Sequence, residues 1–266
     1  MPVDPSKPRT VLVVHGVQAG PDDLNQDRLV EELIRSRIGN IPLPYLCQLY
    51  RYEQINVEAQ KKHHDLLELI ATIPVGEIIT APVMEMVQDV VISLENGSTA
   101  QLIRQGLRQA ILDIFNAGNP CYILAHSLGS IYAFDLLNEL IADGAYFDPS
   151  SRKSWPVQGL ITIGSPIGLE LFKRSGRNAI SDFSAGDKWF RWLNVWDPND
   201  PVVSGTLFGQ QLSGYKIAEN FLSGDPRQRW VIRDIVTDTG KSWLMAHTAY
   251  WNSAVVGDKL VDMMTS

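Results

Sequence analysis

Short runs of β-branched and aromatic residues alternate along this chain with longer amphipathic patterns, and this alternation restricts the fold more than any other feature. The order is typical of a parallel sheet covered by helices, because consecutive parallel strands need a long crossover between them. Several runs are apolar on both alternating faces, as strands buried under helices are. Six runs are predicted to be strands: TVLVV (10–14), PYLCQLY (44–50), CYILA (121–125), GLITIG (159–164), RWLNVW (191–196) and RWVIRDIV (229–236). The sequence therefore predicts an α/β protein with a mostly parallel sheet of about six strands flanked by helices.

Helical periodicity is clearest in four segments between these strands: DDLNQDRLVEELIRSR (22–37), VEAQKKHHDLLELIA (57–71), STAQLIRQGLRQAILDIFNAG (98–118) and LGSIYAFDLLNELIADG (128–144). No repeat, low-complexity segment or linker rich in Pro, Gly or Ser divides the sequence, which predicts a single domain over residues 1–266. Residues 51–97 are roughly twice as long as a single crossover helix needs. This helical insertion is either a cap or one extra helix pair packed on the sheet.

The pentapeptide Ala125-His126-Ser127-Leu128-Gly129 joins the third predicted strand to the helix that follows it. A nucleophile elbow has the same order of elements, because its sharp turn lifts a serine hydroxyl above the strand ends. The serine of such a turn has unfavourable backbone angles, so only small residues fit two places before and after it. By chance alone a small-x-Ser-x-Gly pattern occurs roughly 0.2 times in a chain of this length. Its position between a strand and a helix makes Ser127 a candidate nucleophile.

A serine hydroxyl is a poor nucleophile at neutral pH and needs an imidazole to take its proton and a carboxylate to orient that imidazole. In sheets of this kind the acid and then the histidine follow the serine along the chain. Of the five histidines only His247 lies beyond Ser127. His126 is adjacent to the serine, but its side chain should point away from a neighbour on a tight turn. His247 is therefore the candidate base, and the alternative is a hydrogen-bonded histidine in an aromatic patch.

Two aspartates follow the strand predicted over 191–196, in the turn DPNDPVV. Asp197 is nearer the strand and can form an Asx turn with the backbone. Asp200 lies farther out on the loop, where a carboxylate has to be to reach a histidine on another loop. Asp200 is therefore favoured as the orienting acid, and Asp197 is the alternative acid.

Acyl transfer also needs two backbone N–H donors for the oxyanion of the tetrahedral intermediate. Leu128, the residue after the candidate nucleophile, supplies one of them from the start of its helix. The loop HGVQAGPDD after the first strand supplies the other, because Gly16 lets the backbone approach the substrate and the N–H of Val17 is the natural donor. The same loop has neither the GxGxxG pattern nor the GKS or GKT ending of a phosphate-binding loop, which argues against a nucleotide site.

The segments LVVHGV, ILAHSLGS, NVWDPNDPVV and AHTAYW, in this order on alternating strands and helices, resemble the α/β-hydrolase superfamily. TIGSPIGL (162–169) is similar to the GSP motif that lipase- and esterase-like members have after the strand that follows the elbow. The resemblance spans nearly the whole chain. Only nine residues precede the first predicted strand, which implies a reduced core of six strands without the two leading strands of the full superfamily sheet. Ala125 stands where the usual elbow has glycine.

The resemblance implies a serine hydrolase in which Ser127 attacks, His247 is general base and then general acid, and Asp200 fixes the imidazole. It also implies an oxyanion hole formed by Val17 and Leu128. Such an enzyme cleaves carboxylic esters through an acyl-enzyme intermediate and uses no cofactor and no metal. A thioesterase, an amidase or an acyltransferase with the same triad is an alternative, because the acyl-enzyme step is common to all of them. A catalytically silent α/β-hydrolase fold that serves as a binding protein is a third possibility, against which the complete set of motifs argues.

Loops above the strand ends, at 165–190, 203–228 and within the 51–97 insertion, are expected to form the substrate pocket. Their apolar side chains predict an apolar acyl or alcohol group in the substrate, as in a lipid-like ester. The alternative is that they only pack a cap against the sheet. The residues concerned are Ile167, Leu169, Phe172, Phe183, Leu207, Phe208 and Phe221.

The net charge of -7 argues against a nucleic-acid partner, for which a basic face is needed. The start MPVDPSKPRT lacks the basic and then apolar segments of a signal peptide, so a cytoplasmic location is expected. The most apolar long window, IITAPVMEMVQDVVISL, contains a proline and charged residues, which excludes a transmembrane segment there. Cys47 and Cys121 both lie in predicted buried strands and are expected to be free thiols. The expected partner is a small-molecule or lipid ester, and no feature of the sequence fixes the oligomeric state.

Overall fold

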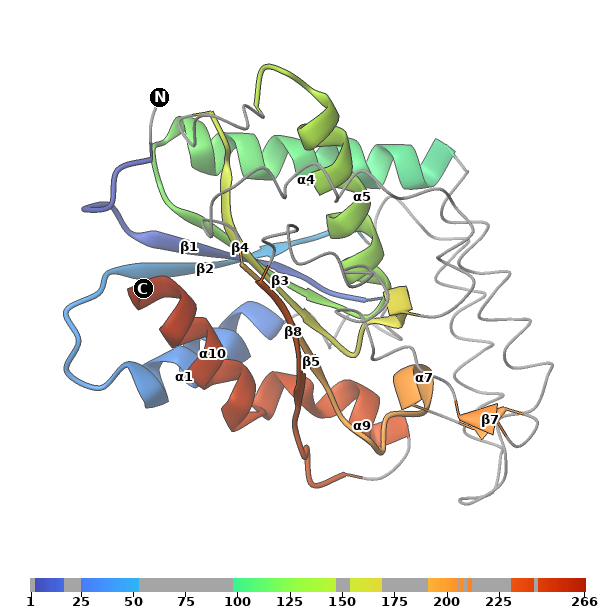
Figure 1. The fold of residues 1–266 in the computed structure, drawn as a ribbon. Helices are drawn as coiled ribbons and strands as arrows, with labels where there is room; N and C mark the ends of the chain where they lie inside the picture. Colours follow the sequence, from blue (N-terminus) through green and yellow to red (C-terminus); the bar gives the residue numbers. More distant parts are fainter. Residues whose placement is uncertain are drawn as a thin grey trace.

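A six-stranded sheet runs through the centre of the structure, with its strands in the order β2-β1-β3-β4-β5-β8 and all of them parallel (Figure 1). The computed structural model describes residues 3–16, 25–52, 98–146, 154–168, 191–204, 206–207, 210–211, 231–241 and 244–266. The strands of the sheet are β1 (Arg9–Val14), β2 (Tyr45–Tyr50), β3 (Cys121–His126), β4 (Val157–Ile163), β5 (Arg191–Trp196) and β8 (Val231–Val236). A separate antiparallel pair consists of β6 (Thr206–Leu207) and β7 (Gln210–Gln211). The prediction of an α/β protein with a six-stranded sheet is confirmed, and the sheet is entirely rather than mostly parallel.

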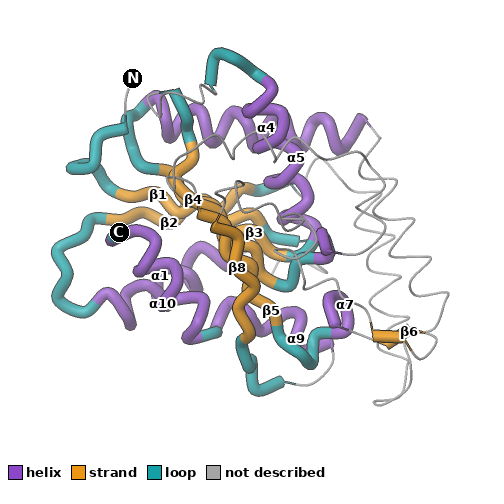
Figure 2. The backbone as a smooth tube through the Cα atoms, in the orientation of Figure 1, coloured by secondary structure: helices purple, strands orange, loops and turns teal. Residues whose placement is uncertain are grey.

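Helices cover both faces of this sheet, as the apolar pattern of its strands requires. Figures 1 and 2 show α4 and α5 on one side of the strands and α1 and α10 on the other. The helices within the described residues are α1 (Gln26–Ile38), α4 (Ser98–Asn116), α5 (Leu128–Ala142), α7 (Pro201–Ser204), α9 (Leu244–Thr248) and α10 (Ala254–Thr265), with 3-10 turns η3 (Pro166–Gly168) and η5 (Ala249–Asn252). The described chain therefore forms a three-layer arrangement of helices, sheet and helices.

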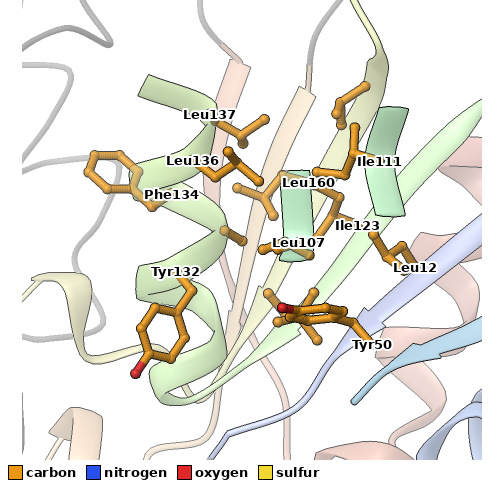
Figure 3. Close-up of a cluster of buried hydrophobic side chains, with 14 of the residues drawn as sticks. Leu12, Tyr50, Leu107, Ile111, Ile123, Tyr132, Phe134, Leu136, Leu137 and Leu160 are labelled. Carbon is orange, nitrogen blue, oxygen red and sulfur yellow. The ribbon is translucent and has the colours of Figure 1, made fainter. Parts of the chain in front are cut away.

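Two hydrophobic cores result from these layers, one on each face of the sheet. Side chains of alternate strand residues enter opposite cores, so that Leu12 faces α4 and α5 while Val11 and Val13 face α1 and α10. The α4/α5 core is shown in Figure 3 and includes Leu12, Ile123 and Leu160 from the strands, Leu107 and Ile111 from α4, and Leu136 and Leu137 from α5. Because both faces of the central strands are buried, their sequences are apolar at nearly every position.

The strand order reverses direction between β1 and β3. From β1 the chain passes through α1 to β2 on one side, and from β3 it passes through α5 to β4 on the other side. The helices α1 and α5 belong to opposite cores, so the loops after β1 and β3 lead to opposite faces of the sheet. In open parallel sheets such a reversal leaves a crevice at the carboxyl ends of the two strands, where ligands bind. The loop after β1 and the turn at Ser127, which directly follows β3, both start at this point.

The predicted element boundaries agree with the structure within a few residues. The strand predicted over 159–164 ends one residue earlier, at Ile163, because Gly164 has a φ of 55° and turns the chain. Residues 229–230 of the last predicted strand, the helix predicted over 57–71 and residues 53–97 of the predicted insertion lie outside the described residues. The interpretation of that insertion as a cap therefore stays a prediction.

The two cysteines are free thiols, and they differ in burial. Cys121 is buried in β3 at the centre of the sheet, whereas Cys47 is only partly buried. The expectation that Cys47 is buried is wrong because β2 is an edge strand, whose first four residues alternate between half-buried and exposed. Among the helices that the structure describes, none combines the length and the apolar character needed to cross a membrane.

Candidate active site

The turn between β3 and α5 holds Ser127 in an unusual backbone conformation. Its φ of 51° and ψ of -128° lie outside the regions that ordinary residues adopt, and among the described residues it is the one non-glycine with positive φ. The Ser127 N–H donates to the carbonyl of Ile163 at 3.0 Å, and its own carbonyl accepts a hydrogen bond from the hydroxyl of Ser130. The hydroxyl of Ser130 also lies 2.7 Å from that of Ser165 in the GSP segment. Contacts to β4 and its following turn therefore hold the strained residue in place.

Glycines make room for this turn against the loop after β1. A β-carbon at Gly129 would lie 2.2 Å from the carbonyl oxygen of His15 and 2.7 Å from that of Val14. A β-carbon at Gly16 would lie 2.7 Å from the β-carbon of Ser127. All three distances are shorter than a β-carbon tolerates from a nonbonded atom, so α5 and the β1 loop meet at Ser127 only because these two positions are glycine.

Ala125 fits the place where the usual elbow has glycine. It lies in β3, opposite Val14 of β1 and Thr162 of β4, and its side chain is fully buried in the α4/α5 core. The extra methyl group is therefore accommodated by core packing, and the backbone angles at Ser127 keep the strained conformation.

Ser127, His247 and Asp200 lie in a hydrogen-bonded row. His247 Nε2 is 2.9 Å from Ser127 Oγ, and His247 Nδ1 is 2.9 Å from Asp200 Oδ2. An ionised carboxylate can only accept, so the proton of the neutral imidazole is on Nδ1 and Nε2 is left as the acceptor for the serine proton. All three residues are buried, and Asp200 is completely so. This arrangement can activate a serine hydroxyl as a nucleophile.

The carboxylate of Asp200 is bound on both of its oxygens. Asp200 immediately precedes α7, and the N–H of Val202 donates to Oδ1 at 2.9 Å. The hydroxyl of Tyr250 donates to Oδ2 at 2.8 Å, beside the bond from His247. The helices α7 and α9 contact each other, and Figure 2 shows both of them beside β5. This contact brings Asp200, just before α7, within 2.9 Å of His247 in α9. A buried charge is tolerated only with such hydrogen bonds.

Asp197, the alternative acid, is bound elsewhere. One oxygen of its carboxylate accepts from the N–H of Asn199 at 2.7 Å, as the Asx-turn interpretation predicts. Its other oxygen accepts from both the N–H and the hydroxyl of Thr239, each at 2.7 Å. The structure therefore places Asp200, and not Asp197, at the imidazole of His247.

His126 contacts the segment that carries His247 rather than Ser127. Its Nε2 lies 2.7 Å from the backbone carbonyl oxygen of His247, and the two rings are 4.8 Å apart between centroids. The ring of Trp251 packs edge-on against the ring of His126 at 5.2 Å. Since a carbonyl can only accept, His126 Nε2 carries the proton of this bond. The residue before the candidate nucleophile thus holds the backbone of the candidate base.

Tyr250 is the site residue that sequence reasoning missed. Its hydroxyl donates to Asp200 and accepts from the N–H of Asp197 at 2.9 Å. Burial, and then the nearby charge of Asp200, raise the pKa of the Tyr250 hydroxyl far above its usual range, so it stays protonated. Tyr250 lies in the segment AHTAYW, three residues after His247, and that spacing on a helical turn was the available signal.

Gly164 of the GSP segment lies directly against this row. A β-carbon there would be 2.8 Å from Cε2 of Tyr250 and 3.1 Å from both Asp200 Oδ2 and His247 Nδ1. The glycine at the end of β4 therefore leaves the space in which the acid, the histidine and the tyrosine meet.

The predicted oxyanion donors and pocket residues are described only in part. Leu128 is the first residue of α5 and follows Ser127 at the positive end of the helix dipole, while Val17 lies outside the described residues. Ile167 is fully buried in the α4/α5 core, so it packs the fold. Leu207 lies in β6. The other predicted pocket residues are outside the described ranges: Leu169, Phe172, Phe183, Phe208 and Phe221.

Within the described part of the chain, no group of three or more His, Cys, Asp or Glu side chains is arranged to hold a metal ion. No protein-family model matches this chain, and no curated protein sequence matches it.

Proposed function

We propose that this chain is a serine hydrolase with the α/β-hydrolase fold, which cleaves carboxylic esters through an acyl-enzyme intermediate. The observation that carries the proposal is an imidazole bound at both nitrogens. His247 Nε2 lies 2.9 Å from Ser127 Oγ, and His247 Nδ1 lies 2.9 Å from Asp200. The position of the serine at the reversal point of a parallel sheet also supports it.

In the proposed reaction Ser127 Oγ attacks the carbonyl carbon of the ester while His247 Nε2 takes the hydroxyl proton. Asp200 stabilises the imidazolium that forms. The tetrahedral intermediate then collapses, the C–O bond to the alcohol breaks, and His247 gives its proton to the leaving alkoxide. A water molecule attacks the acyl-serine by the same route, and the acid product and free Ser127 are released.

The oxyanion of the intermediate would be stabilised by the start of α5. The Leu128 N–H is one proposed donor, and the helix dipole adds a positive partial charge at this position. The Val17 N–H is the second proposed donor. The proximity of Gly16 to Ser127 supports this assignment, because Gly16 directly precedes Val17 in the chain.

A catalytically silent binding protein is disfavoured by the conformation of Ser127. A non-glycine residue at such backbone angles costs about 1–3 kcal/mol and persists only where the surroundings enforce it. Here the bonds to Ile163 and Ser130 enforce it at the residue that faces His247. Backbone strain of this kind is typical of functional sites. A serine with a purely structural role does not need strained backbone angles.

Labelling with a fluorophosphonate probe tests the proposed reaction. The wild type should be labelled, and Ser127→Ala should not, because the probe reacts only with an activated serine. Ser36→Ala is the matched control, since Ser36 lies in α1 and its hydroxyl bonds the Leu33 carbonyl away from the site. An unlabelled wild type, or equal labelling of Ser127→Ala, would overturn the proposal.

The substrate class is proposed to be an ester with an apolar acyl or alcohol group. A panel of p-nitrophenyl esters of rising chain length should give a higher kcat/KM for octanoate than for acetate. A preference for acetate would contradict the apolar pocket while leaving the reaction type intact. Matched thioester and amide substrates compared on the same enzyme separate esterase, thioesterase and amidase activity, and added alcohol acceptors reveal acyl transfer.

A further inference from the structure

We infer that Tyr250 is a positioning residue of the proposed hydrolase, and that its hydroxyl sets how strongly Asp200 stabilises the protonated form of His247. This inference rests on the proposed function and adds a residue to it. It starts from one atom, Asp200 Oδ2, which lies 2.9 Å from His247 Nδ1 and 2.8 Å from the Tyr250 hydroxyl.

The direction of the tyrosine bond is fixed by its other partner. The backbone N–H of Asp197 lies 2.9 Å from the Tyr250 oxygen and can only donate. The ionised Asp200 carboxylate can only accept, so the single hydroxyl proton of Tyr250 points to Asp200 Oδ2. Tyr250 therefore competes with His247 for the negative charge on one oxygen.

Burial makes this competition strong. Tyr250 and Asp200 both have no exposed surface. Water therefore does not replace the hydrogen bond of Asp200 to Tyr250 or its bond to His247. Hydrogen bonds to a charged group are stronger in such surroundings than in water. The raised pKa of Tyr250 keeps the proton on its hydroxyl, so the donor is present over the whole pH range in which an imidazole titrates.

The fold makes space for this contact. Gly164 follows β4 with a φ of 55°, and a β-carbon there would lie 2.8 Å from Cε2 of Tyr250. The centroid of the Tyr250 ring also lies 6.1 Å from that of His126. The aromatic ring therefore lies beside Gly164, which directly follows β4, and near His126 of β3, and its hydroxyl reaches Asp200 at 2.8 Å.

Loss of the hydroxyl should have two effects. More of the carboxylate charge becomes available to His247, which favours the protonated imidazole and moves the acid limb of the kcat/KM profile to higher pH. Asp200 also loses one of its restraints, so the imidazole is held less well in the orientation that faces Ser127. Removing one hydrogen bond to a charged group should lower kcat/KM by about tenfold, and the loss should be in kcat rather than in KM.

Tyr250→Phe tests the inference, with Tyr50→Phe as the matched control. Tyr50 is also buried, and its hydroxyl donates to the Ile103 carbonyl at 2.7 Å, outside the site. Both variants are assayed for p-nitrophenyl ester hydrolysis as a function of pH, with active sites counted by fluorophosphonate titration. The expected result is an acid limb at higher pH in Tyr250→Phe and an unshifted limb in Tyr50→Phe. An unshifted limb in Tyr250→Phe overturns the inference, because a merely structural tyrosine would lower the active fraction and leave the profile of the active molecules unchanged.

A second replacement keeps the test valid where Tyr250→Phe does not fold. A ring-fluorinated tyrosine at position 250 keeps the hydroxyl and the ring but is a stronger donor. It should draw more charge from Asp200 and move the acid limb to lower pH, opposite to the expectation for phenylalanine. No shift, or a shift to higher pH, would contradict the role of Tyr250. If the Ser127→Ala variant kept the ester-hydrolysis activity of the wild type, the proposed function itself would be overturned. The failure of the inference and the failure of the proposed function are therefore distinguishable.

Discussion

The carboxylate of Asp197 is bound by Thr239 through two hydrogen bonds of 2.7 Å, one from its N–H and one from its hydroxyl. Asp197 directly follows β5, and Thr239 lies in the loop after β8, so the pair ties together the carboxyl ends of two neighbouring strands. The two aspartates of the DPND turn thus have different roles. Asp197 holds the loops, and Asp200 faces His247.

Parallel substitution of the two aspartates separates these roles. Asp200→Asn should lower kcat by about 10⁴-fold, because an amide cannot keep the imidazole in the required tautomer. Asp197→Asn should keep most of kcat in its folded fraction and lose about 1–3 kcal/mol of unfolding free energy, because a partly buried donor of Thr239 loses the carboxylate oxygen that accepts its hydrogen bond. Steady-state kinetics and urea unfolding of both variants measure the two effects. A larger loss of kcat in Asp197→Asn than in Asp200→Asn would reverse the assignment.

Gly129→Ala should disrupt the turn that carries Ser127. The added β-carbon would lie 2.2 Å from the His15 carbonyl oxygen, so α5 or the β1 loop must move. We expect a loss of about 1–3 kcal/mol in unfolding free energy and a strong loss of fluorophosphonate labelling. Gly144→Ala is the control, because a β-carbon there meets no atom within 4 Å. Unchanged labelling of Gly129→Ala would show that the contact of α5 with the β1 loop is not needed for the site.

Ala125→Gly introduces the glycine that the usual nucleophile elbow has two residues before its serine. The Ala125 methyl group is fully buried in the α4/α5 core, and glycine also increases the entropy of the unfolded chain. The variant should lose about 1 kcal/mol of unfolding free energy and keep its kcat. Thermal or urea unfolding together with ester hydrolysis checks this. A marked gain in kcat on introducing glycine would mean that the alanine distorts the conformation of Ser127.

Much of the fold could be predicted from the sequence because its signals are local. A buried parallel strand is apolar at nearly every position, and β3 is a clear example. The order of Ser127, Asp200 and His247 is likewise visible without a structure. The only sequence signal for Tyr250 is its place three residues after His247, and that signal does not fix its role, because an aromatic residue there has the same pattern whether it packs or binds a carboxylate. The partner of Asp197 is also invisible, since Thr239 lies 42 residues away along the chain.

The two thiols should react slowly in the folded protein. Burial raises the pKa of Cys121 to about 12, and burial together with Glu31 and Asp27 raises that of Cys47 to about 12. At pH 8 both are neutral thiols, and only the thiolate is a good nucleophile. Iodoacetamide should therefore modify the native chain much more slowly than the urea-unfolded chain, with Cys47 reacting before the more deeply buried Cys121.

The same pKa shifts predict how stability depends on pH. An unfolded chain releases thiol protons from about pH 9, whereas the folded chain keeps them up to about pH 12. Because the unfolded state binds fewer protons in that window, the thiol contribution to stability is complete below pH 9 and falls as the pH rises toward 12. Urea unfolding of the wild type and of Cys121→Ala, each at pH 8 and at a pH above about 9, measures this fall in the unfolding free energy. An equal fall in both proteins would show that Cys121 has no part in it.

His126→Phe tests how the residue before the proposed nucleophile supports the proposed base, His247. The substitution keeps an aromatic ring beside Trp251 and removes the bond to the His247 backbone carbonyl, which is 2.7 Å long. Since this bond holds the backbone of His247 and not its ring nitrogens, kcat should fall by about tenfold while the acid limb of the pH profile keeps its position. The unshifted limb distinguishes the role of His126 from that of Tyr250, because Tyr250→Phe should move the acid limb. If the limb moved in His126→Phe as well, His126 would act on the imidazole through the contact between the two rings, which lie 4.8 Å apart, rather than through the backbone bond.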